Sequence, residues 1–176
     1  LIYLPLFHAF GLWEGPFMSM LTGARVVLTT LFDPSDTLDL IEKEQATRLY
    51  GFDTHWRELA TRQESENRDL SSLRAGILAS GMASSEAVAR RAQKLISPTI
   101  TVWGMTECGI PLHSFLDSSE DERCAGSGYP LPGYEFKIID PETGEILPQL
   151  TTGELCVRGY GVMQGYYRKP EETAQS

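Results

Sequence analysis

Along residues 1–110, apolar positions alternate between two spacings, which predicts strands and helices in turn. Short apolar runs predict strands at residues 1–6, 24–30, 48–52, 75–79 and 99–102, and the runs at 24–30 and 99–102 are also rich in β-branched residues. Apolar positions at helical spacing predict helices at residues 10–21, 34–46 and 54–66, and a fourth helix that is capped by Ser84 or Ser85 and extends to Ile96. Gly23 is expected to end the first helix and Asp33 to cap the second. This alternation is typical of an α/β fold with a mostly parallel sheet flanked by helices.

The pattern changes after residue 125. Apolar residues there alternate with charged ones in two short runs, residues 134–138 and 154–158, and residues 140–144 carry a strong hairpin-turn sequence. Such runs predict short antiparallel strands in a small barrel or sheet. We therefore predict an α/β subdomain over residues 1–125 and part of a small antiparallel β subdomain over residues 126–176.

Composition places the chain among globular proteins, and its net charge argues against two classes of partner. The 176 residues are 41% hydrophobic and 22% charged, as in folded domains. The net charge of −9 argues against nucleic-acid and anionic-membrane binding, because phosphate groups need a basic surface. No apolar run is long enough to span a bilayer. The acidic stretch at residues 117–123 is predicted to be a surface loop.

The cysteines carry no sign of a disulfide framework or a zinc site. Cys108, Cys124 and Cys156 are widely spaced and odd in number, without the spacing of metal ligands. We expect each to be a small, partly buried apolar residue. A reducing compartment follows as the simplest interpretation, and we predict a cytoplasmic location.

The most informative segment is the end of the predicted strand at residues 99–102. Trp103 and Gly104 follow this strand, and Thr106 and Glu107 stand side by side just after them. Ligands bind at such strand ends in open α/β sheets. An indole can stack on a base, a hydroxyl can bond a phosphate and a carboxylate can hold magnesium. Taken singly, Trp103 could be a core aromatic and Glu107 a solvated carboxylate, but together the residues predict a nucleoside triphosphate site.

Five stretches, in the same order along the chain, resemble motifs of one enzyme superfamily. Trp-Gly-Met-Thr-Glu at residues 103–107 resembles the Tyr-Gly-x-Thr-Glu of the adenylate-forming, AMP-binding enzymes, which include acyl-CoA synthetases, nonribosomal adenylation domains and beetle luciferases. Leu-Pro-Leu-Phe-His at residues 4–8 and Ser-Gly-Met-Ala-Ser at residues 80–84 are similar to the family's Leu-Pro-x-Phe-His and its glycine-rich turn. Residues 126–133 and 153–173 resemble its Gly-x-x-Gly-x-Pro-x-Pro-Gly and its Gly-Glu-Leu…Gly-Tyr…Pro-Glu-x-Thr runs.

The resemblance implies an ATP-dependent acid–thiol ligase that makes an acyl-adenylate from a carboxylic acid and then passes the acyl group to coenzyme A. Trp103 takes the place of the tyrosine that stacks on adenine, and Thr106 is expected to contact the phosphates. Glu107 is expected to hold Mg²⁺. His8 is expected at the acyl and pyrophosphate end of the cleft, or else to be a hydrogen-bonded packing residue. The other residues expected along the nucleotide are Gly81, Met82, Ala83, Gly104 and Met105.

The resemblance leaves the acceptor and the acid open. The alternatives are an enzyme that loads a carrier protein, as nonribosomal or fatty-acid AMP ligases do, and a non-catalytic binding module. The apolar residues at 10–21 suit a pocket for an aliphatic or aryl acid as well as ordinary core, and core is our prediction. By resemblance, the family's phosphate loop would precede Leu1 and its catalytic lysine would follow Ser176, so we expect the segment alone to be inactive.

Overall fold

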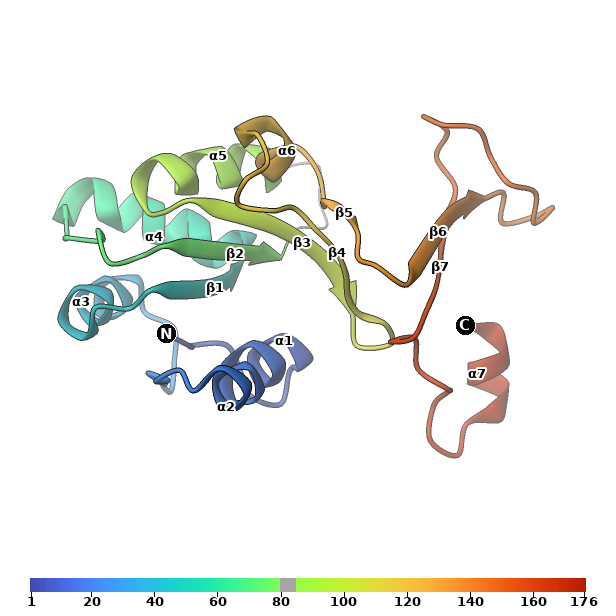
Figure 1. Ribbon diagram of the computed structural model, residues 1–176, viewed down its shortest axis with the longest axis horizontal. Coiled ribbons are helices and arrows are strands. Elements are labelled where there is room, and N and C mark those ends of the chain that lie inside the picture. Colours follow the sequence, from blue (N-terminus) through green and yellow to red (C-terminus); the bar gives the residue numbers. More distant parts are fainter. Residues whose placement is uncertain (80–84) are drawn as a thin grey trace. The chain divides into compact units, whose positions relative to one another are not determined.

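The computed structural model describes residues 1–79 and 85–176 in two compact units (Figure 1). The first unit consists of Leu1–Trp103 and Leu112–Tyr129, and the second of Gly104–Pro111 and Pro130–Ser176. The domain division at residues 125 and 126 stays a prediction. Within the described part of the chain, no helix combines the length and the apolar character needed to cross a membrane.

The predicted α/β fold is confirmed by a sheet of five strands in the order β1–β2–β3–β4–β5. Its strands are β1 (Arg48–Phe52), β2 (Ala75–Ala79), β3 (Thr99–Met105), β4 (Gly109–His113) and β5 (Tyr129–Pro130). The first three run parallel, with Arg48 opposite Ala75 and Gly76 opposite Thr99. Parallel pairing explains their apolar sequences, because both faces of such strands are covered.

Helices α3 (Pro34–Glu44), α4 (Asp53–Glu66) and α5 (Ser85–Leu95) flank the parallel strands (Figure 1). Asp33 caps α3 as predicted, because its carboxylate accepts a hydrogen bond from the Asp36 N–H at 2.9 Å. The middle helix, α4, packs against α3, α5 and β1. The core beneath these helices is formed by the fully buried side chains of Leu38, Ile41, Leu49, Trp56, Leu59 and Leu78.

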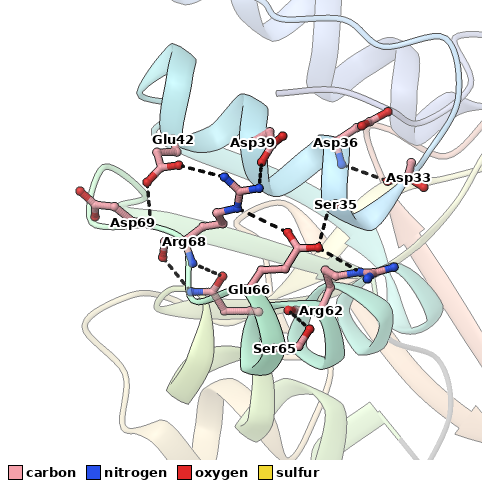
Figure 2. A network of polar contacts seen from close by, with 11 residues as sticks. Asp33, Ser35, Asp36, Asp39, Glu42, Arg62, Ser65, Glu66, Arg68 and Asp69 are labelled. Atoms are coloured by element: carbon pink, nitrogen blue, oxygen red, sulfur yellow. Dashed lines mark hydrogen bonds and ion pairs between the residues drawn. The ribbon is translucent and has the colours of Figure 1, made fainter.

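Arg68, two residues after the end of α4, joins α3 and α4 through a network of ion pairs (Figure 2). Its guanidinium nitrogens lie 2.5 Å from an Asp39 oxygen, 3.6 Å from a Glu42 oxygen and 3.4 Å from a Glu66 oxygen. Glu42 also accepts a hydrogen bond from the Asp69 N–H at 3.1 Å. The partly exposed Arg68 thus connects α3 with the end of α4, and Glu42 also binds the loop that follows α4.

Arg68→Gln should lower the free energy of unfolding at about 0.01 M salt and have little effect at about 1 M. The reason is that the Debye length falls from roughly 30 Å to roughly 3 Å, so salt screens these partly exposed pairs. Urea denaturation of the natural protein at both salt concentrations measures this difference. Arg57→Gln, at an exposed position of α4, is the matched control. Equal losses at both salt concentrations would mean that packing, and not charge, provides the contribution of Arg68.

The N-terminal segments differ from the pattern-based prediction. The strands expected at residues 1–6 and 24–30 reduce to one parallel bridge between Ile2 and Leu28. The helix expected at residues 10–21 is divided into α1 (Ala9–Leu12), the π-helical η1 (Trp13–Phe17) and α2 (Met18–Thr22). Pro16 lies within η1, and proline lacks the N–H that a regular helix would use there. Gly23 ends α2 at φ 67°, as predicted.

The prediction that residues 10–21 form ordinary core is wrong for most of this segment. Phe10 is buried, but Phe17, Met20 and Leu21 are 40%, 71% and 81% exposed. Helical spacing shows which residues share a face, whereas burial also needs a second element to cover that face. The sequence pattern therefore shows which residues share a helix face, but not whether another element covers that face.

The acidic stretch predicted to be a loop contains a short helix, α6 (Glu120–Cys124). The Glu122 N–H donates to the Ser119 hydroxyl at 3.3 Å, and the Ser119 N–H donates to the Glu122 carboxylate at 2.9 Å. This reciprocal capping box satisfies two backbone donors at the helix start. Its Ser-x-x-Glu signature is present in the sequence, but the charge density of the stretch led to the wrong prediction.

The second unit confirms the predicted antiparallel strands. Strands β6 (Tyr134–Ile139) and β7 (Glu154–Gly159) form a two-stranded antiparallel sheet. The expected turn follows β6, with the Gly144 N–H donating to the Asp140 carbonyl at 2.8 Å and Gly144 at φ 73°. Helix α7 (Pro170–Gln175) lies at the end of this unit.

Candidate functional site

The predicted nucleotide motif occupies the end of β3 and the turn that leads into β4. The strand continues to Met105, beyond the end predicted at the tryptophan and glycine. The Cys108 N–H donates to the Met105 carbonyl at 3.2 Å, which closes a β-turn with Thr106 and Glu107 at its centre. Gly109 follows at φ 71°, the left-handed conformation that short hairpins often require. Thr106 and Glu107 therefore lie at the tip of a tight hairpin.

Gly104 allows the two strands of this hairpin to approach closely. A Cβ at Gly104 would lie 2.1 Å from the Gly109 carbonyl oxygen and 2.9 Å from the Ile110 Cα. Both obstacles are backbone atoms, which cannot move aside as a flexible side chain could. Glycine at this position of the motif therefore has a steric reason as well as its expected place beside the nucleotide.

Gly104→Ala should destabilise the protein by about 1–3 kcal/mol and also shift the Thr106–Glu107 turn. The matched control is Gly126→Ala, because a Cβ there would have its nearest neighbour at 3.9 Å. Urea denaturation measures the stability, and metal-dependent ATP binding reports on the turn. Wild-type stability and binding in the Gly104→Ala variant would contradict the close-approach explanation.

Residues of the second unit hold this turn from several sides. The Met163 N–H donates to the Glu107 carbonyl at 2.7 Å, and the Tyr134 hydroxyl donates to the Cys108 carbonyl at 3.1 Å. Gly161 makes room for that phenol, because a Cβ at Gly161 would lie 1.9 Å from the Tyr134 hydroxyl oxygen. The backbone of the turn is thus fixed by contacts with residues 26 or more positions later.

The side chains of the two polar motif residues have different surroundings. Thr106 is exposed, whereas Glu107 is half-buried. The Tyr166 hydroxyl donates to Glu107 Oε1 at 2.8 Å. This hydrogen bond raises the pKa of Tyr166 above its usual value, so the phenol keeps the proton that it donates. One hairpin thus carries four of the predicted site residues, which are Gly104, Met105, Thr106 and Glu107.

Two predicted site residues belong to the first unit. Trp103 is half-buried, so its ring is not sealed in the core. His8 is exposed and caps α1, with its Nδ1 accepting a hydrogen bond from the Phe10 N–H at 3.1 Å. Its ring also meets the Phe52 ring edge-on, with centroids 5.4 Å apart. Because Nδ1 is the acceptor, the neutral imidazole carries its proton on Nε2, which can serve as a donor.

The predicted residues Gly81, Met82 and Ala83 lie outside the described residues. Within residues 1–79 and 85–176, no group of three or more histidine, cysteine, aspartate or glutamate side chains could hold a metal ion. A metal at Glu107 would therefore need oxygens from a bound substrate and from water. Mg²⁺ is commonly held in this way, through one or two carboxylates together with phosphate groups.

The sequence did not reveal the residues that support the turn. Tyr166 lies 59 positions from Glu107, and Tyr134 lies 26 positions from Cys108. The Gly-Tyr pair at residues 165–166 belongs to a run that resembles the family, which is the one signal in the sequence, but the resemblance assigns no role to Tyr166.

Comparison with known proteins gives consistent results. The sequence profile of the AMP-binding enzyme family matches residues 1–167. The mitochondrial medium-chain acyl-CoA ligase ACSF2 of Rattus norvegicus is 30% identical over 175 residues, which cover 98% of this chain and 28% of the rat protein. The acyl-CoA ligase SID4 of Ajellomyces capsulatus is 34% identical over 98% of this chain and 30% of its own length. The chain thus spans less than a third of these relatives.

Solved structures agree with this result. O-succinylbenzoate coenzyme A synthetase (MenE) from Bacillus subtilis, in complex with ATP and magnesium ion, has a TM-score of 0.83 and 30% identity, covering 99% of this chain and 35% of MenE. ATP-bound MatB from Rhodopseudomonas palustris has a TM-score of 0.81 and 29% identity, covering 99% of this chain and 34% of MatB. The fold prediction and the sequence resemblance therefore agree with independent comparisons.

Proposed function

Since this chain belongs to the AMP-binding enzyme family, we propose that the natural protein joins a carboxylic acid to coenzyme A with the use of ATP. In the first step, a carboxylate oxygen forms a bond to the α-phosphorus of ATP while the bond to the bridging oxygen breaks and pyrophosphate leaves. In the second step, the thiol of coenzyme A loses its proton and attacks the acyl carbon, and AMP leaves. One observation carries this proposal: the family profile matches residues 1–167, and this stretch includes the hairpin at the end of β3 that presents the motif.

Glu107 and Thr106 are the residues to which we assign the polyphosphate. The half-buried carboxylate of Glu107 offers the hard oxygen that Mg²⁺ prefers, and Oε2 remains for it because the Tyr166 phenol occupies Oε1. When bound, Mg²⁺ neutralises negative charge on the phosphates. The exposed Thr106 hydroxyl at the tip of the hairpin can donate to a phosphate oxygen. The contribution of these residues is positioning and charge complementarity.

The remaining residues are assigned to the base and to the acyl end of the substrates. The half-buried Trp103 has a ring that can stack on adenine, and Gly104 and Met105 continue the same strand. Gly81, Met82 and Ala83 are assigned to the adenine side by the sequence resemblance alone. His8, whose Nε2–H is available as a donor, suits the developing charge on the carboxylate or pyrophosphate oxygens.

Coenzyme A is the acceptor that the relatives favour over a carrier protein. The rat and fungal relatives are both acyl-CoA ligases, and MenE is a coenzyme A synthetase. The acid is a separate question, because these names point to different substrates. A test therefore needs a panel that includes medium-chain carboxylic acids, after the medium-chain acyl group in the name of the rat relative, and o-succinylbenzoate, after the name of MenE.

The test is exchange of labelled pyrophosphate into ATP by the whole natural protein with each acid, followed by assay for the acyl-CoA thioester. Exchange that depends on one class of acid, together with thioester formation, is the expected result. Exchange without a thioester would favour the carrier-protein alternative. No exchange with any acid, from folded protein that also fails to bind ATP, would favour a non-catalytic module and overturn the proposal.

A further inference from the structure

The Glu107 carboxylate is held by one side chain of the C-terminal segment. The Tyr166 hydroxyl donates to Glu107 Oε1 at 2.8 Å, and three residues earlier the Met163 N–H donates to the Glu107 carbonyl at 2.7 Å. One segment of the second unit thus contacts both the backbone and the side chain of Glu107. A residue held at both positions has little freedom to change its side-chain rotamer.

Tyr166 is itself fixed by α7, the helix that follows in the same unit (Figure 1). The Tyr166 N–H donates to the Thr173 hydroxyl oxygen at 2.9 Å, and that hydroxyl donates to the Lys169 carbonyl at 2.7 Å. The Lys169 N–H donates in turn to the Tyr166 carbonyl at 3.1 Å. These three bonds close a small cycle that orients the backbone of Tyr166.

Gly165 has the backbone conformation and the space that this cycle needs. Its φ is 149°, and a Cβ there would lie 2.6 Å from Thr173 Cγ2. A Cβ at this position would therefore force the Thr173 side chain to shift, and the backbone conformation itself favours glycine. The contacts form an ordered series from Thr173 through Tyr166 to the carboxylate of Glu107.

We propose that Tyr166, anchored by Thr173, is a positioning residue that orients the Glu107 carboxylate toward a magnesium ion on the nucleotide. This inference rests on the proposed function, because it assumes that Glu107 holds the metal. The phenol occupies Oε1 and limits rotation of the carboxylate, so Oε2 keeps its lone pairs for the cation. Residues that orient a metal ligand in this way typically change metal affinity or activity by about 10–100-fold when replaced.

The decisive variant is Tyr166→Phe in the whole natural protein, because it removes only the hydroxyl. ATP binding is measured by isothermal titration calorimetry at a series of Mn²⁺ concentrations, with Mn²⁺ as the probe for the metal. The concentration of Mn²⁺ needed for half of the metal-dependent gain in ATP affinity should rise about tenfold. ATP affinity without metal should stay unchanged. Tyr167→Phe is the matched control, since Tyr167 is 83% exposed and lies one residue away.

Two further variants separate positioning from a general structural effect. Thr173→Val should reproduce part of the loss, and Thr173→Ser should restore wild-type behaviour, because serine keeps the hydroxyl that accepts from the Tyr166 N–H. In a Glu107→Gln background, Tyr166→Phe should add no further loss, since the two residues would act through one contact.

The outcomes distinguish this inference from the proposed function. If wild-type protein binds ATP with metal dependence and Tyr166→Phe keeps that dependence unchanged, the positioning role is wrong and the proposed function stands. If Tyr166→Phe and Glu107→Gln have additive effects, the role is also wrong. If wild-type protein shows no metal-dependent ATP binding, both proposals are overturned.

Discussion

Glu107→Gln should reduce the rate of acyl-adenylate formation by about a hundredfold or more. Glutamine has nearly the same shape and can still accept a hydrogen bond from the Tyr166 hydroxyl, so the turn should keep its conformation. It lacks the negative charge of the carboxylate ligands through which proteins commonly hold Mg²⁺. The loss should therefore appear in metal-dependent catalysis and not in folding. Exchange of labelled pyrophosphate into ATP, measured over a range of Mg²⁺ concentrations, gives both the rate and the metal requirement.

Glu142→Gln serves as the matched control for this prediction. Glu142 is an exposed residue of the turn after β6, in the same unit as Glu107, so the substitution removes the same charge from a place where we assign it no role. Its exchange rate should equal that of the wild type. If Glu107→Gln retained wild-type exchange at every Mg²⁺ concentration, the assignment of the metal to this carboxylate would be wrong.

Much of the fold could be predicted where local preference and burial point to the same structure. The runs at β1 and β2 are short, apolar and bounded by polar residues, and α4 begins and ends within one residue of its prediction. The strands expected near Ile2 and Leu28 fail because a strand also needs a partner ladder. Only one bridge forms between them, although Ile2 itself is buried. Apolar character alone does not specify the hydrogen bonding of such a segment.

The candidate site likewise contains residues that the sequence motif identifies and residues that only the tertiary fold brings to them. Trp103, Thr106 and Glu107 are close in sequence, so a motif could identify them together. The residues that hold their turn come from much later in the chain, and Tyr166 is the example with the largest separation from Glu107. Hydrogen bonds between such distant positions depend on the tertiary fold. Residue spacing in a single sequence contains no direct signal for them.

Trp56→Ala should cause the largest loss of stability, about 3–5 kcal/mol. The Trp56 side chain is fully buried in α4, and its Nε1–H donates to the Ile77 carbonyl at 3.3 Å. It fills the space above Gly76, where a Cβ would lie 2.2 Å from the indole ring. Alanine would leave a cavity between α4 and β2 and would also leave the Ile77 carbonyl without this donor. Urea denaturation of the natural protein, followed by circular dichroism, measures the change in the free energy of unfolding.

Trp13→Ala provides the comparison that makes this prediction sharp. The two substitutions remove the same group, but Trp13 is 56% exposed and its ring contacts Phe17, which is itself 40% exposed. Its replacement should therefore cost much less, because little apolar surface leaves a buried environment. Similar losses for both variants would mean that Trp56 is not the centre of this core. Burial thus separates the two tryptophans, because Trp56 is enclosed over Gly76 of β2 whereas more than half of Trp13 is exposed.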